Sequence, residues 1–181
     1  IGTFFREEIG DKHNINFFIG LPESKEDKIA EIIPFEKISE DKNTKRHGSL
    51  TVAQKALRNS ASTIEHHNSR EWRKAEIPAA NGQGSAAGLA KLFSLVTPED
   101  PSLKILKDKT VEKMTEIQIE GRDLVLAVSL RWGNGFVLNK HKVVYGPVEH
   151  SFGHSGYGGS CAFADPKNKI GMSYVMNKME N

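Results

Sequence analysis

Apolar residues are spaced as in helices over the first two thirds of the chain and as in strands over the last third. The clearest helical spacing covers residues 86–96, and Ser85, directly before it, is a residue type that caps helix N-termini. Further helices are predicted over residues 1–12, 50–57 and 102–119. Strands are predicted over residues 123–131, 151–155, 160–164 and 170–175. The pattern predicts the α+β class in a single domain, with a mainly helical and loop region over residues 1–120 and antiparallel strands over residues 121–181.

The composition is that of an ordinary globular protein. The 181 residues carry 25 basic and 23 acidic side chains, and neither half is biased toward one sign, which disfavours a nucleic-acid surface. Nine Phe, two Trp and three Tyr residues are spread along the chain and disfavour disorder. The longest clean apolar run extends only from Leu124 to Val128, far short of the ~20 residues of a membrane span.

Two details of the sequence concern its origin. The first residue is Ile1 rather than Met, and helical spacing starts at once, so we expect the true N-terminus to lie elsewhere. Cys161 is the single cysteine, and no Asn-x-Ser/Thr sequon occurs. Both observations favour a reducing, cytoplasmic location.

The stretch from Gly153 to Gly159 contains four glycines between two predicted strands. Its residues alone leave two interpretations open. The glycines could serve only the twist of a hairpin, or they could let the backbone of a strand edge approach a ligand closely. In the second case, exposed N–H groups of this stretch could hold an oxyanion.

Other candidate motifs are weaker. Gly82-x-Gly84 with Gly88 resembles a dinucleotide-binding loop, but such a loop must follow a buried strand, so we interpret these glycines as a tight turn before a helix. His150 and His154 are spaced like metal ligands on a helix, but the glycines beside His154 disfavour a helix there. The pair His66-His67 has no partner at ligand spacing, so we expect no metal and no other cofactor.

Two residues could supply a nucleophile. Gly153-His154-Ser155 resembles the start of a nucleophile elbow, but Tyr157 stands where the elbow needs its second glycine, so Ser155 is disfavoured as an independent nucleophile. No positive charge lies next to Cys161 in the sequence, so we interpret this thiol as a small core residue on a strand.

Two blocks of sequence, residues 72–93 and residues 152–166 with 174–177, resemble the serine beta-lactamase-like hydrolases, near class C beta-lactamases and their esterase relatives. Residues 4–9 and 17–22 also fit this family. The resemblance implies part of a beta-lactamase/transpeptidase-like fold, with a helical region followed by antiparallel strands. Activity in that family rests on three motifs: a Ser-x-x-Lys with the nucleophile, a Tyr-x-Asn or Ser-x-Asn that shuttles a proton, and a Lys-Thr/Ser-Gly on an inner strand.

The third motif corresponds to His154-Ser155-Gly156 in this sequence. By the resemblance, Ser155 hydrogen-bonds the substrate, and the backbone N–H of Tyr157 is one oxyanion donor. Asn81 matches a loop position that borders the pocket. His154 replaces a lysine, and because histidine is largely neutral near pH 7, the change favours small esters, amides or peptides over substrates with a carboxylate.

The other two motifs have no counterpart in this sequence. None of the three tyrosines is followed by x-Asn, and no Ser-x-Asn occurs. The one Ser-x-x-Lys, Ser39 to Lys42, lies in a charged loop behind the region where the family has its nucleophile, and we interpret it as chance. The nucleophile is therefore expected upstream of Ile1.

The sequence thus predicts a portion of a serine hydrolase that acts through an acyl-enzyme in the full-length protein and is inactive as an isolated chain. The alternative is a non-catalytic scaffold or binding module of the same fold. The expected partner is a small-molecule ester, amide or peptide, without nucleic acid or membrane.

Overall fold

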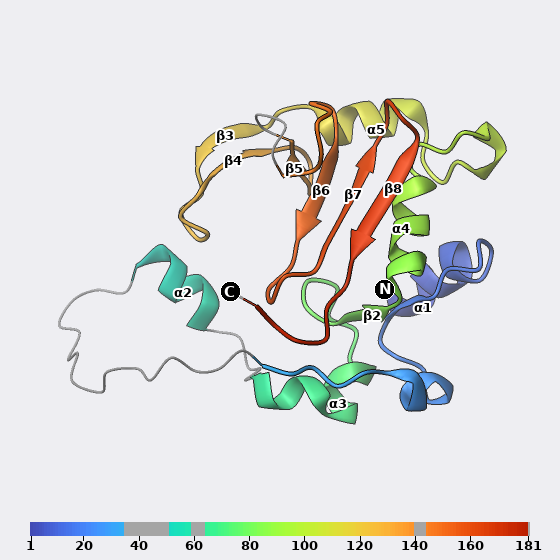
Figure 1. Ribbon diagram of the computed structural model, residues 1–181, viewed down its shortest axis with the longest axis vertical. Coiled ribbons are helices and arrows are strands. Elements are labelled where there is room, and N and C mark those ends of the chain that lie inside the picture. Colours follow the sequence, from blue (N-terminus) through green and yellow to red (C-terminus); the bar gives the residue numbers. More distant parts are fainter. Residues whose placement is uncertain (35–50, 59–63, 140–143, 181) are drawn as a thin grey trace.

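The structure is a computed structural model that describes residues 1–34, 51–58, 64–139 and 144–180. Within these ranges, an antiparallel sheet of six strands forms one part of the molecule, and a sheet of two strands forms a second part (Figure 1). The strands of the larger sheet are β3 Ile119–Arg122, β4 Ser129–Trp132, β5 Val137–Leu138, β6 Phe152–Ser155, β7 Cys161–Asp165 and β8 Ile170–Tyr174. Each pairs with the next strand along the chain, so their order in the sheet is their order in the sequence.

One face of the larger sheet is covered by helix α4, Ala86–Ser94. As predicted, Ser85 caps this helix, and its hydroxyl accepts the N–H of Gly88 at 3.0 Å. The helix lies very close to β8, because a Cβ on Gly171 would come within 2.2 Å of the Ala90 carbonyl oxygen. The core beside it contains Val96, Leu138, Phe152 and Ala164.

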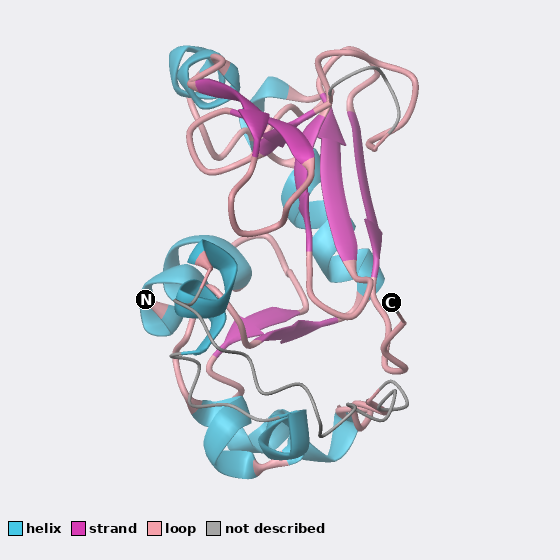
Figure 2. Ribbon diagram, turned by 90° about the vertical axis from the view of Figure 1, so that its left-hand side faces the viewer, coloured by secondary structure: helices cyan, strands magenta, loops and turns pink. Residues whose placement is uncertain are grey.

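The smaller sheet lies beneath the larger one (Figure 2). It pairs β1 Phe17–Ile19 with β2 Gly82–Gly84 in antiparallel register. Helix α1, Gly2–Phe5, precedes it and continues into a wide turn over Arg6–Gly10. The other helices are α2 Val52–Arg58, α3 Arg70–Lys74 and α5 Asp108–Thr115, with 3-10 turns at Glu23–Lys28, Ile64–Asn68 and Pro101–Leu103.

The predicted turn at Gly82–Gly84 is wrong, because these residues form β2. A Cβ on Gly82 would lie 2.4 Å from the Phe17 ring, so glycine is needed for the strand to fit against β1. The pairing joins segments that are far apart in the sequence, and local turn signals do not contain it.

The predicted helix over residues 102–119 is wrong at both ends, since α5 covers only Asp108–Thr115 and β3 begins at Ile119. The strand predicted over residues 123–131 begins only at Ser129. The Asp123 carboxylate accepts the N–H groups of Val125 and Leu126, each at 2.8 Å, and so holds this segment as a turn. None of the described helices is long and apolar enough to cross a membrane.

Candidate active site

The candidate site is the exposed end of β6 together with the turn that follows it. The pairing of β6 with β5 stops at Gly153, so His154 and Ser155 extend beyond that neighbour, and both are exposed. The Gly156 N–H donates to the Ser160 carbonyl at 2.6 Å and closes the turn toward β7. Tyr157 lies at the turn with 70% of its surface exposed. The structure therefore brings His154, Ser155, Gly156 and Tyr157 together in one open segment.

The turn is packed from below by the chain that follows β8. Gly158 is buried with φ +92°, and a Cβ there would lie 2.8 Å from the Cε atoms of Met176 and Met179. The Glu180 N–H also donates to the Gly158 carbonyl at 3.1 Å. Glycine is thus required at this position by both its backbone conformation and its neighbours.

His154 lies on the sheet face that carries Phe152, because alternate strand residues share a face. Its ring lies 5.6 Å from the Trp132 ring, centroid to centroid, at an interplanar angle of 43°. Its Nδ1 lies 2.7 Å from the Ser155 carbonyl oxygen. Since a carbonyl oxygen only accepts, we assign the hydrogen of the neutral ring to Nδ1, which leaves the lone pair on Nε2.

Ser155 lies on the opposite face, across from Cys161 of β7. Tyr145 covers this face, with only 2% of its surface exposed and its ring 5.6 Å from that of Phe163. Burial raises the pKa of the Tyr145 hydroxyl, while a hydrogen bond with the Ser155 side chain opposes that rise. Tyr145 therefore restrains the Ser155 side chain through this hydrogen bond. The sequence holds no local signal for that role.

The loop that leads into β6 is organised by Asn139, which is fully buried. Its Nδ2 donates to the carbonyl oxygens of Gly146 and Val148, both at 2.8 Å. Its Oδ1 accepts the N–H groups of Tyr145 at 3.1 Å and of Val144 at 3.2 Å. One side chain thus fixes both the backbone that carries Tyr145 and the approach to β6.

Asn81, the predicted pocket residue, is buried in the loop before β2. Its Nδ2 donates to the carbonyl oxygens of Trp72 at 2.7 Å and Ala75 at 2.6 Å, and its Oδ1 accepts the Ile77 N–H at 3.0 Å. These contacts give the side chain a structural part in the loop. Its contact with a substrate stays a prediction.

The remaining candidates are dispersed. His150 is exposed in the turn before β6, and His67 stacks on Trp72 with ring centroids 4.9 Å apart. Burial, and then the nearby His66, lower the pKa of His67. In the described ranges, no three His, Cys, Asp or Glu side chains meet as a metal site requires. Cys161 is partly buried on β7. Ser39 and Lys42 lie outside the described residues.

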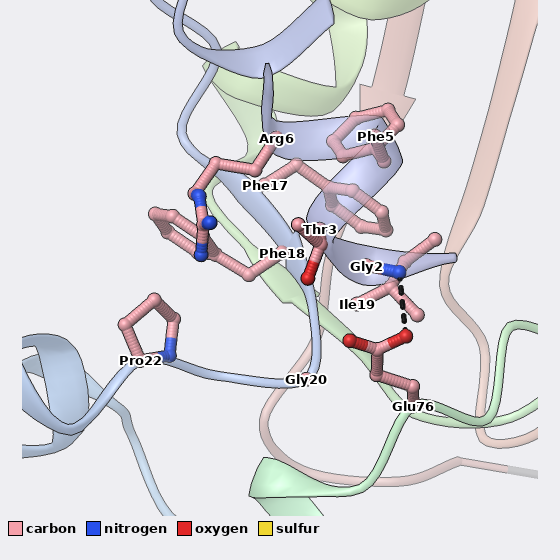
Figure 3. A pocket seen from close by; sticks show the side chains of 10 residues that line it. All are labelled: Gly2, Thr3, Phe5, Arg6, Phe17, Phe18, Ile19, Gly20, Pro22 and Glu76. Atoms are coloured by element: carbon pink, nitrogen blue, oxygen red, sulfur yellow. Dashed lines mark hydrogen bonds between the residues drawn. The ribbon is translucent and has the colours of Figure 1, made fainter. Parts of the chain in front are cut away.

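Among the described residues, hollows also occur away from this site. A cavity of about 30 Å³ lies between α1 and β1, where the Gly2 N–H donates to the Glu76 carboxylate at 2.8 Å (Figure 3). It has room for roughly one water molecule. A more open hollow of about 500 Å³ lies at the end of α4, between Lys91 and Lys169. Neither is lined by residues of β6 or its turn.

The model of the family described as Beta-lactamase matches this sequence along its whole length, residues 1–181. The chain belongs to the beta-lactamase family. The crystal structure of a family VIII carboxylesterase is 35% identical, with a TM-score of 0.84 over 99% of this chain and 46% of its own. A penicillin-binding protein homolog from Caulobacter crescentus is also 35% identical, with a TM-score of 0.81 over 98% of this chain and 47% of its own.

A curated relative is the Esterase/beta-lactamase LipL of Mycobacterium tuberculosis. It is 30% identical over an alignment of 110 residues that covers 58% of this chain and 24% of LipL. The chain thus spans about a quarter of LipL and slightly less than half of the two related structures. The predicted α+β class and the predicted family are both confirmed.

Proposed function

We propose that the whole protein hydrolyses small-molecule esters through an acyl-enzyme, and that this chain supplies one wall of the site. The observation that carries the proposal is the exposed end of β6. There, His154 and Ser155 extend beyond β5, and by the resemblance His154-Ser155-Gly156 corresponds to the family's third motif. The esterase and carboxylesterase relatives support ester hydrolysis as the reaction.

Each residue of the segment has a proposed role. The Ser155 hydroxyl hydrogen-bonds the substrate, and the Tyr157 backbone N–H donates to the oxyanion that forms at the ester carbonyl. His154 flanks the substrate in place of the family's lysine. The nucleophilic serine comes from another segment of the whole protein.

The proposed reaction has two steps. The serine oxygen attacks the ester carbonyl carbon, the carbon–oxygen bond to the alcohol breaks, and the alcohol leaves with a proton. Water then attacks the acyl-serine, which releases the carboxylic acid and restores the serine hydroxyl. Each attack places negative charge on the carbonyl oxygen, which is the charge that the Tyr157 N–H would stabilise.

The proposal favours esters over beta-lactams. Lysine keeps its positive charge at pH 7 and attracts the carboxylate of a beta-lactam, whereas histidine is mostly neutral at this pH. Amides and small peptides remain within the proposed substrate class. Faster hydrolysis of a cephalosporin than of short-chain aryl esters by the whole protein would contradict this preference.

The proposal is tested with the whole protein, a short-chain aryl ester and a fluorophosphonate probe. We expect turnover of the ester and covalent labelling of a serine. Ser155→Ala should lower kcat/KM about tenfold, the loss expected for one hydrogen bond. The matched control is His150→Asn, which changes an exposed histidine outside the segment and should leave kcat/KM unchanged. Absence of both labelling and turnover would favour the non-catalytic scaffold instead.

The isolated chain is a separate test. We expect no ester turnover from residues 1–181 alone, because binding groups without the nucleophile leave most of the barrier in place. Esterase activity of the pure chain that Ser39→Ala abolishes would overturn this expectation and the interpretation of Ser39 as chance.

A further inference from the structure

Trp132, at the end of the β3–β4 hairpin, lies beside His154 at the exposed end of β6. It is the last residue of β4 and pairs with Ile119 on one side and Val137 on the other. Its side chain is half-buried, and its ring is the aromatic neighbour of His154 at 5.6 Å. Such ring pairs are attractive beyond the area that they bury, so Trp132 restrains an otherwise exposed imidazole.

The hairpin in turn restrains Trp132. The Asp123 N–H donates to the Val128 carbonyl at 2.8 Å, and the register of β3 and β4 then places Asp123 and Trp132 on the same face. Gly121, between them on that face, has no side chain to separate the two. Figure 1 shows the hairpin curling beside β6, with its loop at the level where β6 ends.

The Trp132 side chain lies within hydrogen-bonding range of the Asp123 carboxylate, which also accepts two N–H groups of its own turn. The backbone N–H groups of Leu126 and Val125 are the main cause of its lowered pKa, and the bond from Trp132 lowers it further. An indole has a single N–H donor. With this N–H toward Asp123, the indole has its ring beside His154.

We propose that Trp132, restrained by Asp123, is a positioning residue for the His154 ring. In the position that it holds, Nδ1 donates to the Ser155 carbonyl, and Nε2 faces outward as a proton acceptor at the ester site. The catalytic part of this inference rests on the proposed ester hydrolysis. The contact between the two rings does not depend on it. A lysine at position 154 would only donate, so an outward lone pair is a property that the histidine adds to the site.

The contact is tested by fluorine NMR of the whole protein labelled with 5-fluorotryptophan. The resonance lost in Trp132→Phe belongs to Trp132. We expect its chemical shift to follow pH with the titration of one imidazole, and this response to vanish in His154→Asn but persist in His150→Asn. Trp72, which stacks on His67, provides an internal example of a tryptophan beside a titrating histidine. A Trp132 resonance that ignores pH, or responds equally in His154→Asn, would overturn the proposal.

The positioning role is tested by kinetics on folded protein. Trp132→Ala should lower kcat about three- to tenfold with little change in KM, and should shift the acidic limb of the pH–rate profile. Trp132→Phe keeps a ring against His154 and should restore most of kcat. Asp123→Asn keeps an acceptor for the indole and should cost less than Asp123→Ala. The control Trp72→Phe changes the other tryptophan–histidine pair and should leave kcat unchanged.

The two experiments separate the inference from the function on which its catalytic part rests. If the whole protein does not turn over esters, the proposed function fails, while the fluorine measurement still decides the contact. If esters are hydrolysed and Trp132→Ala keeps both kcat and the pH–rate profile, the positioning role is overturned and the proposed function stands.

Discussion

Replacing Asn139 by alanine should remove the support of the loop that enters β6. The side chain is fully buried, and four of its hydrogen bonds are 3.2 Å or shorter. Alanine makes none of them and leaves the backbone groups of the loop without their partner. Buried backbone groups that lose a partner are costly, so we expect a large loss of stability.

The size of that loss follows from the contacts. A hydrogen bond contributes about 1 kcal/mol net, so four bonds indicate a loss of about 4 kcal/mol in the free energy of unfolding. Folded domains are stable by only about 5–15 kcal/mol, so the variant should lie close to the limit of folding. Asn139→Asp should be at least as damaging at pH 7, since a carboxylate cannot donate to the carbonyl oxygens of Gly146 and Val148.

Urea unfolding followed by circular dichroism measures the loss. The matched control is Asn134→Ala, because Asn134 is exposed and its side chain donates one bond, to the Lys113 carbonyl at 2.6 Å. The control should lose about 1 kcal/mol or less. If Asn139→Ala loses no more than Asn134→Ala, the reasoning that this side chain organises the loop is refuted.

Three further predictions concern stability and use the same urea assay. Ser85→Ala should lower the free energy of unfolding by about 1 kcal/mol, because it removes the cap of α4. Ser94→Ala, at the other end of the helix, should lower it clearly less, and equal losses would argue against the cap. Gly158→Ala should lower the free energy of unfolding by about 2–3 kcal/mol, and Gly159→Ala should lower it less. Both residues have positive φ, but only at Gly158 would the added Cβ clash with neighbouring side chains. The pKa of Tyr145 is raised in the folded protein, so above pH ~10 the unfolded chain releases this proton first and stability falls as the pH rises. Tyr145→Phe should lose this alkaline sensitivity, and an unchanged pH dependence would contradict the assignment.

The last three strands and α4 could be predicted from the sequence because their signals are local. Predicted strands at 151–155, 160–164 and 170–175 match β6, β7 and β8 to within one residue at each end. Glycine-rich and Asp-Pro turns separate them, and alternation fixes which residues face the core. The helix after Ser85 was predictable for the same reason, since the cap and the apolar spacing adjoin each other.

The elements that could not be predicted depend on distant partners. β2 exists only because Phe17–Ile19 pairs with it, and its glycines indicate a turn when they are considered alone. The helix predicted over residues 102–119 is interrupted where the Ile105 N–H donates to the Leu95 carbonyl at 3.2 Å. It also ends early, where the Gln118 N–H donates to the Trp132 carbonyl at 2.8 Å. Both bonds draw backbone groups away from the helical pattern.

The same distinction applies to the site. The candidates His154, Ser155 and Tyr157 could be named from the sequence because one contiguous motif carries them. Trp132 and Asn139 could not, because each acts through partners from other segments of the chain. The strand register that brings Trp132 to His154 has no signature at either residue.

The division between exposed and supporting residues implies that activity and stability can be changed separately at this site. His154 and Ser155 are exposed, so substitutions there should change the free energy of unfolding by only about 1 kcal/mol, the value of one ring contact or one hydrogen bond, while altering the proposed chemistry. Asn139 and Gly158 are buried, so substitutions there should mainly lower the free energy of unfolding. Trp132 lies between these two groups, half-buried and in contact with the exposed histidine. Trp132→Ala should therefore lower the free energy of unfolding and kcat together. Trp132→Phe should keep most of kcat, because it keeps a ring against His154.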